Sequence, residues 1–238
     1  MAREAAEEIL SLFYPRRCPV CQDIVTPRGE KICPECRRRI TFIEEPVCRK
    51  CGREIPYPEE EYCDTCRQYP RSFEAGISLM RYDRVGQASM QGFKYHGRPE
   101  YGAYYMEEMA ARHGAWIRSR RADALIPVPI HKSRRRQRGY NQAEVLAKEL
   151  SRLTGIPALP TVLIRTKKTV AQKKLGGRER QLNLQRAMEV KNLPADVRRV
   201  ILIDDIYTTG STAEACTRVL KAAGVEAVFV LTVCMVGE

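Results

Sequence analysis

Residues Val200 to Thr212 read Val-Ile-Leu-Ile-Asp-Asp-Ile-Tyr-Thr-Thr-Gly-Ser-Thr. The first four are apolar and branched, which predicts a short buried strand. The adjacent carboxylates Asp204 and Asp205 are expected where that strand ends. A turn of small, mostly hydroxylated residues follows, and helical spacing from Ala213 to Ala223 predicts a helix after it. The stretch is therefore typical of an α/β fold, in which a strand leads through a turn into a helix.

This turn has the chemistry of a phosphate site. Ligands of open α/β sheets bind at the carboxyl ends of the strands, and the free N–H groups of a helix N-terminus bind anions. Glycine allows the backbone to approach the anion, hydroxyls add donors, and two carboxylates suit the vicinal hydroxyls of a sugar. An ordinary turn with a capping Ser or Thr is the alternative, but buried strands rarely end in two bare carboxylates. We predict a sugar-phosphate site whose phosphate is held by Thr208, Thr209, Gly210, Ser211 and Thr212.

The charge of the chain is unevenly distributed. The 238 residues carry a formal net charge of +12. Residues 1–70 contain 12 Lys and Arg against 13 Asp and Glu, whereas residues 71–238 contain 29 against 16. Basic surfaces also serve solubility, but an excess confined to one part of the chain favours polyanionic ligands, either phosphates or nucleic acid.

No targeting or membrane segment is visible in the sequence. Residues 1–8 are charged, unlike the apolar core of a signal peptide. The longest nearly apolar run, residues 227–236, is too short to span a bilayer. We therefore expect a cytoplasmic protein without membrane insertion, in which cysteines serve as metal ligands rather than disulfides.

Eight of the ten cysteines form four C-x-x-C pairs, and the first members of successive pairs lie 15 residues apart. The pairs are Cys18/Cys21, Cys33/Cys36, Cys48/Cys51 and Cys63/Cys66. Two such pairs complete a tetrahedral Cys₄ site, which has no open position and is therefore structural. We predict two Zn²⁺ sites in sequential order, 18/21/33/36 and 48/51/63/66, with an interleaved pairing as the alternative. Iron–sulfur ligation is less favoured, because nothing else in the sequence suggests redox work.

A domain boundary is expected in residues 68–72. It separates a small Cys-rich module, residues 1–70 with a short amphipathic helix at 5–13, from an α/β domain of residues 71–238. Cys216 and Cys234 lie outside the array and are expected to be small core residues. Further strands are predicted at residues 75–82, 124–130, 163–166 and 227–233, and helices at 104–117 and 143–153. This alternation favours a mostly parallel sheet flanked by helices.

Two basic segments are candidates for contact with polyanions. Residues 131–138 are predicted to form a long loop that suits pyrophosphate or nucleic acid, before a helix capped by Asn141 with Glu144 three residues on. In residues 93–98, aromatic and basic side chains that include Lys94 and Tyr95 interleave, as in runs that stack bases and contact phosphates. Packing of these aromatics under a loop is the alternative. The cationic residues of the first segment are Lys132, Arg134, Arg135, Arg136 and Arg138.

Residues 200–212 resemble the 5-phosphoribosyl-1-pyrophosphate (PRPP) signature of type I phosphoribosyltransferases. The resemblance implies the fold of that family, with Asp204 and Asp205 holding the ribose 2′ and 3′ hydroxyls and residues 208–212 holding the 5′-phosphate. It also implies Mg²⁺ bound with PRPP, a pyrophosphate loop at Lys132 and Arg134, and a flexible loop that closes over PRPP. That loop corresponds to residues 167–186, in which Lys173, Lys174 and Arg178 join the acidic pair as expected catalytic residues.

The whole chain resembles a narrower family. Pro127-Val-Pro-Ile-His131, Arg138-Gly-Tyr-Asn-Gln142, the eight cysteines and the PRPP signature are similar to the ComF competence proteins and their GntX-type relatives. The similarity covers about residues 15–235, although Met188 stands where the family often has Phe. It implies a protein of natural transformation that binds single-stranded DNA and PRPP and works with a DNA-uptake helicase. Further matching positions are Arg165, Thr169, Gln172, Leu175, Arg178 and Asn183.

A working phosphoribosyltransferase is the alternative function. Transfer from PRPP passes through an oxocarbenium-like state, so the enzyme mainly positions groups and stabilises charge. No recognisable base-binding set occurs in residues 71–115. We therefore expect PRPP binding, whereas the sequence does not identify an acceptor, a DNA sequence preference or an oligomeric state.

Overall fold

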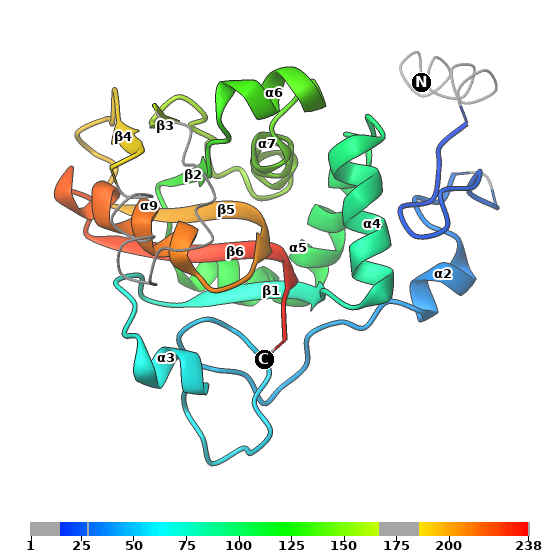
Figure 1. Cartoon of the computed structure of the whole chain (residues 1–238), viewed down its shortest axis with the longest axis horizontal. Coiled ribbons are helices and arrows are strands. Elements are labelled where there is room, and N and C mark those ends of the chain that lie inside the picture. Colours follow the sequence, from blue (N-terminus) through cyan, green and yellow to red (C-terminus); the bar gives the residue numbers. More distant parts are fainter. Residues whose placement is uncertain (1–14, 28, 167–185, 238) are drawn as a thin grey trace, which may run out of the picture.

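A four-stranded parallel sheet forms the centre of the computed structural model, which describes residues 15–27, 29–166 and 186–237 (Figure 1). The strand order is β1-β6-β5-β2. Every residue of β6 is buried, as expected for a strand that is covered on both faces. The strands are β1 (Gly76–Arg81), β2 (Ala124–Pro127), β5 (Arg199–Tyr207) and β6 (Ala227–Met235).

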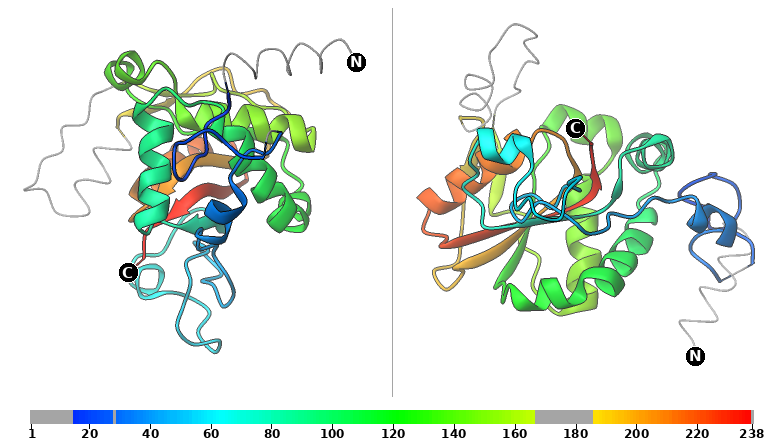
Figure 2. Two further views of the ribbon diagram at one scale, coloured as in Figure 1. Left: turned by 90° about the vertical axis from the view of Figure 1, so that its right-hand side faces the viewer. Right: turned by 90° about the horizontal axis from the view of Figure 1, so that it is seen from below.

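Helices cover both faces of this sheet, so the predicted fold class is confirmed (Figures 1 and 2). In β5, Ile201 and Ile203 lie in one core with α5 and α7, whereas Val200 and Leu202 lie in the other core with α9. Successive side chains of a strand point to opposite faces, which explains this division. Cys216 and Cys234 are fully buried, as predicted. The three helices are α5 (Tyr101–Ser119), α7 (Gln142–Thr154) and α9 (Ser211–Ala222).

Shorter elements complete the α/β part. Helix α4 (Arg84–Tyr95) begins at Asp83, whose carboxylate accepts hydrogen bonds from two backbone N–H groups of the first turn. Strands β3 (Leu163–Arg165) and β4 (Met188–Val190) pair in antiparallel fashion beside α9. Among the described residues, no helix has the length and apolar character needed to cross a membrane.

The Cys-rich module contributes two short helices, α2 (Pro34–Arg38) and α3 (Asp64–Gln68). Figure 1 shows α2 beside α4, and α3 below β1. The first four cysteines belong to or pack against the core that includes α4 and α5, and the second four belong to the core that includes α9. The two halves of the module therefore contact opposite faces of the sheet. The predicted boundary falls between α3 and β1, and the predicted helix at 5–13 lies outside the described residues.

The prediction of a long loop at residues 131–138 was wrong, because helix α6 (Lys132–Arg138) occupies this segment. Arg, Lys and Gln are good helix formers. The helix also has both ends capped: the His131 ring accepts a hydrogen bond from the Ser133 N–H, and Gly139 adopts a left-handed conformation with φ of 83°. Asn141 caps α7 as predicted, but Glu144 pairs with Arg135 at 2.7 Å.

Strand β5 continues beyond Ile203, so the acidic pair lies inside the strand near its carboxyl end. The prediction placed the end of the strand at the acidic pair itself. Backbone pairing with β6 continues from Asp204 opposite Thr232 to Tyr207 opposite Met235. The ladder uses only backbone groups, so polar side chains at the edge of the sheet do not end it.

Candidate functional site

The turn between β5 and α9 forms the centre of the site. Gly210 is the N-cap of α9 and has a φ of 73°, which favours glycine. A Cβ atom at this position would lie 2.1 Å from the Tyr207 Oη. Gly210 itself has no capping side chain, but the Thr209 hydroxyl accepts a hydrogen bond from the Ser211 N–H at 3.4 Å, so a Thr does satisfy one donor of the first turn of α9. The turn thus presents a helix N-terminus at the carboxyl edge of a parallel sheet, where anions bind.

An open pocket lies at this edge. It brings Asp204 together with three of the five residues predicted to hold a phosphate. Thr232, in the neighbouring strand β6, lines it as well and was not predicted. The lining includes Asp204, Tyr207, Thr208, Gly210, Thr212 and Thr232.

Asp205 contacts a cation from another element. The Lys94 Nζ lies 3.1 Å from the Asp205 carboxylate, and the two side chains are only 16% and 15% exposed. Lys94 was predicted to contact nucleic acid together with Tyr95, but the two neighbours point differently. Tyr95 is 57% exposed, whereas Lys94 is directed at the acidic pair.

Asp204 has a carboxyl group that titrates close to neutrality. Burial, followed by the neighbouring charge of Asp205, raises its pKa from 3.8 to about 7. A hydrogen bond from the Asp205 N–H and the charges of Lys94 and Arg165 act in the opposite direction. Perturbed carboxyl groups of this kind cluster at functional sites.

Arg165 is a site residue that the sequence matched to the family but did not assign to the site. Burial lowers its pKa most, and the neighbouring charge of Arg134 lowers it further, whereas Asp204 raises it. The end of β3 therefore brings a guanidinium close to both the acidic pair and the basic helix α6. Its position at the end of a strand was the signal available in the sequence.

Helix α6 carries the predicted pyrophosphate and nucleic-acid residues on an exposed surface. Arg134 and Arg136 are exposed, and Arg138 extends this basic surface to α4. Its guanidinium lies 4.9 Å from the centroid of the Tyr95 ring and donates a hydrogen bond to the Tyr95 Oη at 3.1 Å. Lys132 and Arg135 are exposed on the same helix. The predicted Lys173, Lys174 and Arg178 lie outside the described residues.

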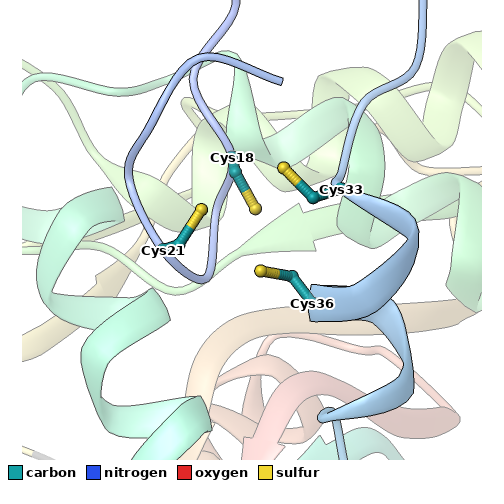
Figure 3. Close-up of side chains that lie close together, drawn as sticks. All are labelled: Cys18, Cys21, Cys33 and Cys36. Atoms are coloured by element: carbon teal, nitrogen blue, oxygen red, sulfur yellow. The ribbon is translucent and has the colours of Figure 1, made fainter. Parts of the chain in front are cut away.

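The cysteines form two groups of four, in sequential rather than interleaved order. Within each group the sulfur atoms all lie within 4.8 Å of one another. Figure 3 shows Cys18 and Cys21 on a loop and Cys33 and Cys36 at the start of α2, with their sulfurs directed at a common centre. The Cys51 and Cys63 sulfurs are 3.7 Å apart. Tetrahedral Zn–S bonds of about 2.3 Å require sulfurs about 3.8 Å apart. The donor sets fit two structural Zn²⁺ sites.

Comparison with known proteins connects this geometry to named relatives. Residues 9–67 match the double zinc ribbon domain family. The chain is 42% identical to Competence protein F of Haemophilus influenzae over 106 residues, which are 44% of this chain and 46% of that protein. It is 28% identical to the DNA utilization protein YhgH of Escherichia coli K12 over 71% of this chain and 75% of that protein. Competence protein ComFC of Bacillus subtilis is 29% identical, over 62% of this chain and 58% of that protein. The match thus spans less than half of the Haemophilus protein.

Proposed function

Because this chain belongs to the ComF family of competence proteins, we propose that it binds PRPP and single-stranded DNA during DNA uptake. Its relatives carry names that refer to competence and to DNA utilization. These names support a role in competence and DNA uptake, and the proposal adds the two ligands, PRPP and single-stranded DNA. A cytoplasmic location and a DNA-uptake helicase as partner complete it.

The turn from Thr208 to Thr212 carries the PRPP part of the proposal. A 5′-phosphate on the N–H groups at the start of α9 would have Asp204 of strand β5 within the same pocket for the ribose hydroxyls. Lys132, Arg134 and Arg165 supply positive charge for the pyrophosphate. Mg²⁺ would be held mainly by oxygens of PRPP, since it keeps few protein ligands in such sites.

The basic surface of α6 with Tyr95 supports the single-stranded DNA part. Exposed arginines contact phosphates, and an exposed tyrosine stacks on a base whatever its identity. Arg138 already stacks on Tyr95, so phosphate and base contacts would occur side by side. The excess of Lys and Arg in residues 71–238 gives this part of the chain the positive charge that binding to DNA phosphates requires.

A titration of a fluorescently labelled single-stranded oligonucleotide, with and without PRPP–Mg²⁺, tests both parts. We expect binding that weakens as salt increases, and an affinity that changes when PRPP is present. Linkage requires PRPP affinity to change by the same factor when DNA is bound. No binding of any oligonucleotide at low ionic strength would contradict the DNA part. Binding of DNA without any effect of PRPP would separate the two activities.

Transfer of the phosphoribosyl group is the second candidate function, and one observation favours it. A carboxyl group with a pKa of about 7, such as that of Asp204, can donate or accept a proton near neutral pH. We expect Mg²⁺-dependent pyrophosphate release with some base or nucleotide, abolished by Asp204→Asn combined with Asp205→Asn. If no acceptor of a broad panel causes pyrophosphate release although PRPP binds, transferase activity would be contradicted.

A further inference from the structure

Arg53 of the Cys-rich module and Arg71, directly after that module, donate hydrogen bonds to the phosphate turn. The Arg53 Nη2 lies 3.0 Å from the carbonyl oxygen of Thr208, and the Arg71 Nη2 lies 2.7 Å from the carbonyl oxygen of Thr209. Arg53 follows Cys51 by two residues and is only 6% exposed. Both contacts join segments more than 130 residues apart, and both reach backbone carbonyls rather than side chains.

We propose that Arg53 and Arg71 are positioning residues of the phosphate site, and that the second Cys₄ cluster is therefore a structural part of that site. The inference deepens the proposed function and rests on PRPP binding at the turn from Thr208 to Thr212. The second cluster is the group formed by Cys48, Cys51, Cys63 and Cys66.

The planarity of the peptide bond gives these contacts their effect. In a trans peptide the C=O of one residue and the N–H of the next point in opposite directions. With the carbonyls of Thr208 and Thr209 directed at the two guanidinium groups, the N–H groups of Thr209 and Gly210 are directed to the other side of the turn. Charge-assisted bonds to the carbonyls also polarise these N–H groups and add positive potential. The two arginines thus preorganise donors for an anion without touching it.

Further contacts fix the second cluster against the same turn. Gly52 packs so closely on β1 that a Cβ atom there would lie 2.5 Å from the Gly76 carbonyl oxygen. The ring of Phe73 meets the ring of Tyr207 edge to face, with centroids 6.4 Å apart. Ser72 donates two hydrogen bonds to Glu214 in the first turn of α9, from its N–H at 2.7 Å and its hydroxyl at 2.6 Å. The arginines therefore extend from a segment that is attached by several contacts to β1, to β5 and to the first turn of α9.

The first cluster provides a control that the chain itself contains. Its module contacts α5 through Arg37, which lies 2.6 Å from Glu108, and through Lys31, which pairs with Glu107. Gln22 bonds to His96 at the end of α4. The segment that holds the first four cysteines thus contacts α4, β1 and α5. Among the residues that the structure describes, no hydrogen bond or ion pair joins this segment to residues 208–212. Only the second cluster should affect the phosphate site.

Calorimetric titration of PRPP–Mg²⁺ into variants of the full chain tests the proposal. We expect Arg53→Met and Arg71→Met each to weaken binding by about tenfold, as for the loss of one charge-assisted hydrogen bond. Arg49→Met is the matched control, because Arg49 also lies beside the second Cys₄ cluster but is exposed and pairs with Glu61. It should bind within about twofold of the wild type, and melting temperatures and zinc content would verify folding. Equal PRPP affinity of wild type, Arg53→Met and Arg71→Met would overturn the proposal.

A second measurement does not depend on PRPP and so separates this inference from the proposed function. Backbone hydrogen exchange of residues 208–212 should be faster in Arg53→Met and Arg71→Met than in Arg49→Met, because the turn has lost its anchors. Unchanged exchange in this segment would overturn the positioning role even if PRPP binds. Wild-type protein that fails to bind PRPP, with exchange faster as expected, would contradict the proposed ligand and leave the positioning role supported.

Zinc affinity provides the reciprocal test. Cys21→Ser leaves the second cluster as the only complete one, and Cys51→Ser leaves the first. By linkage, PRPP–Mg²⁺ should raise the zinc affinity of Cys21→Ser by a few-fold, measured by equilibrium competition with a chromogenic chelator, and leave the zinc affinity of Cys51→Ser unchanged. Equal effects on both variants would contradict the assignment of the second cluster to the site.

Discussion

Asp204 and Asp205 are neighbours in sequence but have different surroundings. Successive residues of a strand face opposite sides of the sheet, so Asp205 meets Lys94 of α4, whereas Asp204 lines the pocket beside α9. Asp205 thus has a cationic partner, whereas burial and Asp205 itself raise the pKa of Asp204 to about 7. The two carboxylates therefore face different groups: Asp205 faces the Lys94 ammonium, and Asp204 faces the pocket at the start of α9.

The raised pKa of Asp204 predicts a pH dependence of stability. Because the folded-state pKa of about 7 exceeds the ordinary value of 3.8, the carboxyl contributes stability below about pH 4 that is lost as the pH rises to about 7. Asp204→Asn has no carboxyl to titrate, so it does not lose this stability as the pH rises. Its free energy of unfolding relative to wild type should rise by about 2 kcal/mol between pH 5.5 and pH 7.5. Urea denaturation across this range measures it, with exposed Asp196→Asn as the control. A difference that stays constant with pH would contradict the shift.

Lys94 should stabilise the acidic pair rather than bind DNA. Lys94→Met leaves the half-buried Asp205 carboxylate without its partner, which should lower the free energy of unfolding by about 2 kcal/mol. Tyr95→Ala should instead weaken binding of single-stranded DNA about fivefold or more, since base stacking contributes about 1–3 kcal/mol. Urea denaturation measures the stability of each variant, and fluorescence anisotropy of a labelled oligonucleotide measures its DNA affinity. Loss of DNA binding in Lys94→Met as large as in Tyr95→Ala, at unchanged stability, would contradict this role of Lys94.

At the scale of elements, helix α6 marks the limit of what the sequence pattern could predict. Its seven residues contain no apolar residue, so no helical periodicity was available to distinguish it from a loop. The caps at His131 and Gly139 supply the missing stability. Strand β6 was predictable because it is a nearly continuous apolar run, and α7 because its apolar residues recur at helical spacing.

The exposed face of α6 should determine the salt dependence of DNA binding. Each phosphate contact that is lost lowers the slope of log affinity against log salt by about 0.7 for single strands. Arg134→Gln with Arg136→Gln should therefore lower the slope by about 1.4. Arg198→Gln is the control, because Arg198 is exposed at the amino edge of the sheet, before β5. Equal slopes for the double variant and the wild type would exclude α6 from the DNA contact.

At the scale of the whole molecule, long-range contacts are what the sequence could not provide. The spacing of the cysteines predicted both Cys₄ groups and their sequential order. Nothing in the spacing indicated that Arg53 would reach Thr208, or that α4 would bring Lys94 to Asp205. Such contacts depend on how separate elements pack, whereas motif chemistry depends on residues that are close in sequence.

The two Zn²⁺ sites should each contribute separately to the stability of the molecule. Wild-type protein should contain two equivalents of Zn²⁺, and Cys21→Ser and Cys51→Ser about one each. Binding to a structural site is coupled to folding, so each variant should melt lower by on the order of 10 °C. Elemental analysis with thermal unfolding measures both. One equivalent in the wild type, or no change in melting temperature, would contradict two structural sites.

The central claim is that the end of β5 and the start of α9 bind PRPP, and calorimetry of PRPP–Mg²⁺ with wild type and the Asp204→Asn, Asp205→Asn double variant tests it most directly. We predict one PRPP per chain and at least about tenfold weaker binding by the variant, because each ribose hydroxyl loses a charged acceptor and meets a neutral amide. Simple charge attraction predicts the reverse, since PRPP is an anion and the variant is more positive. No binding by the wild type, or equal or tighter binding by the variant, would contradict the claim.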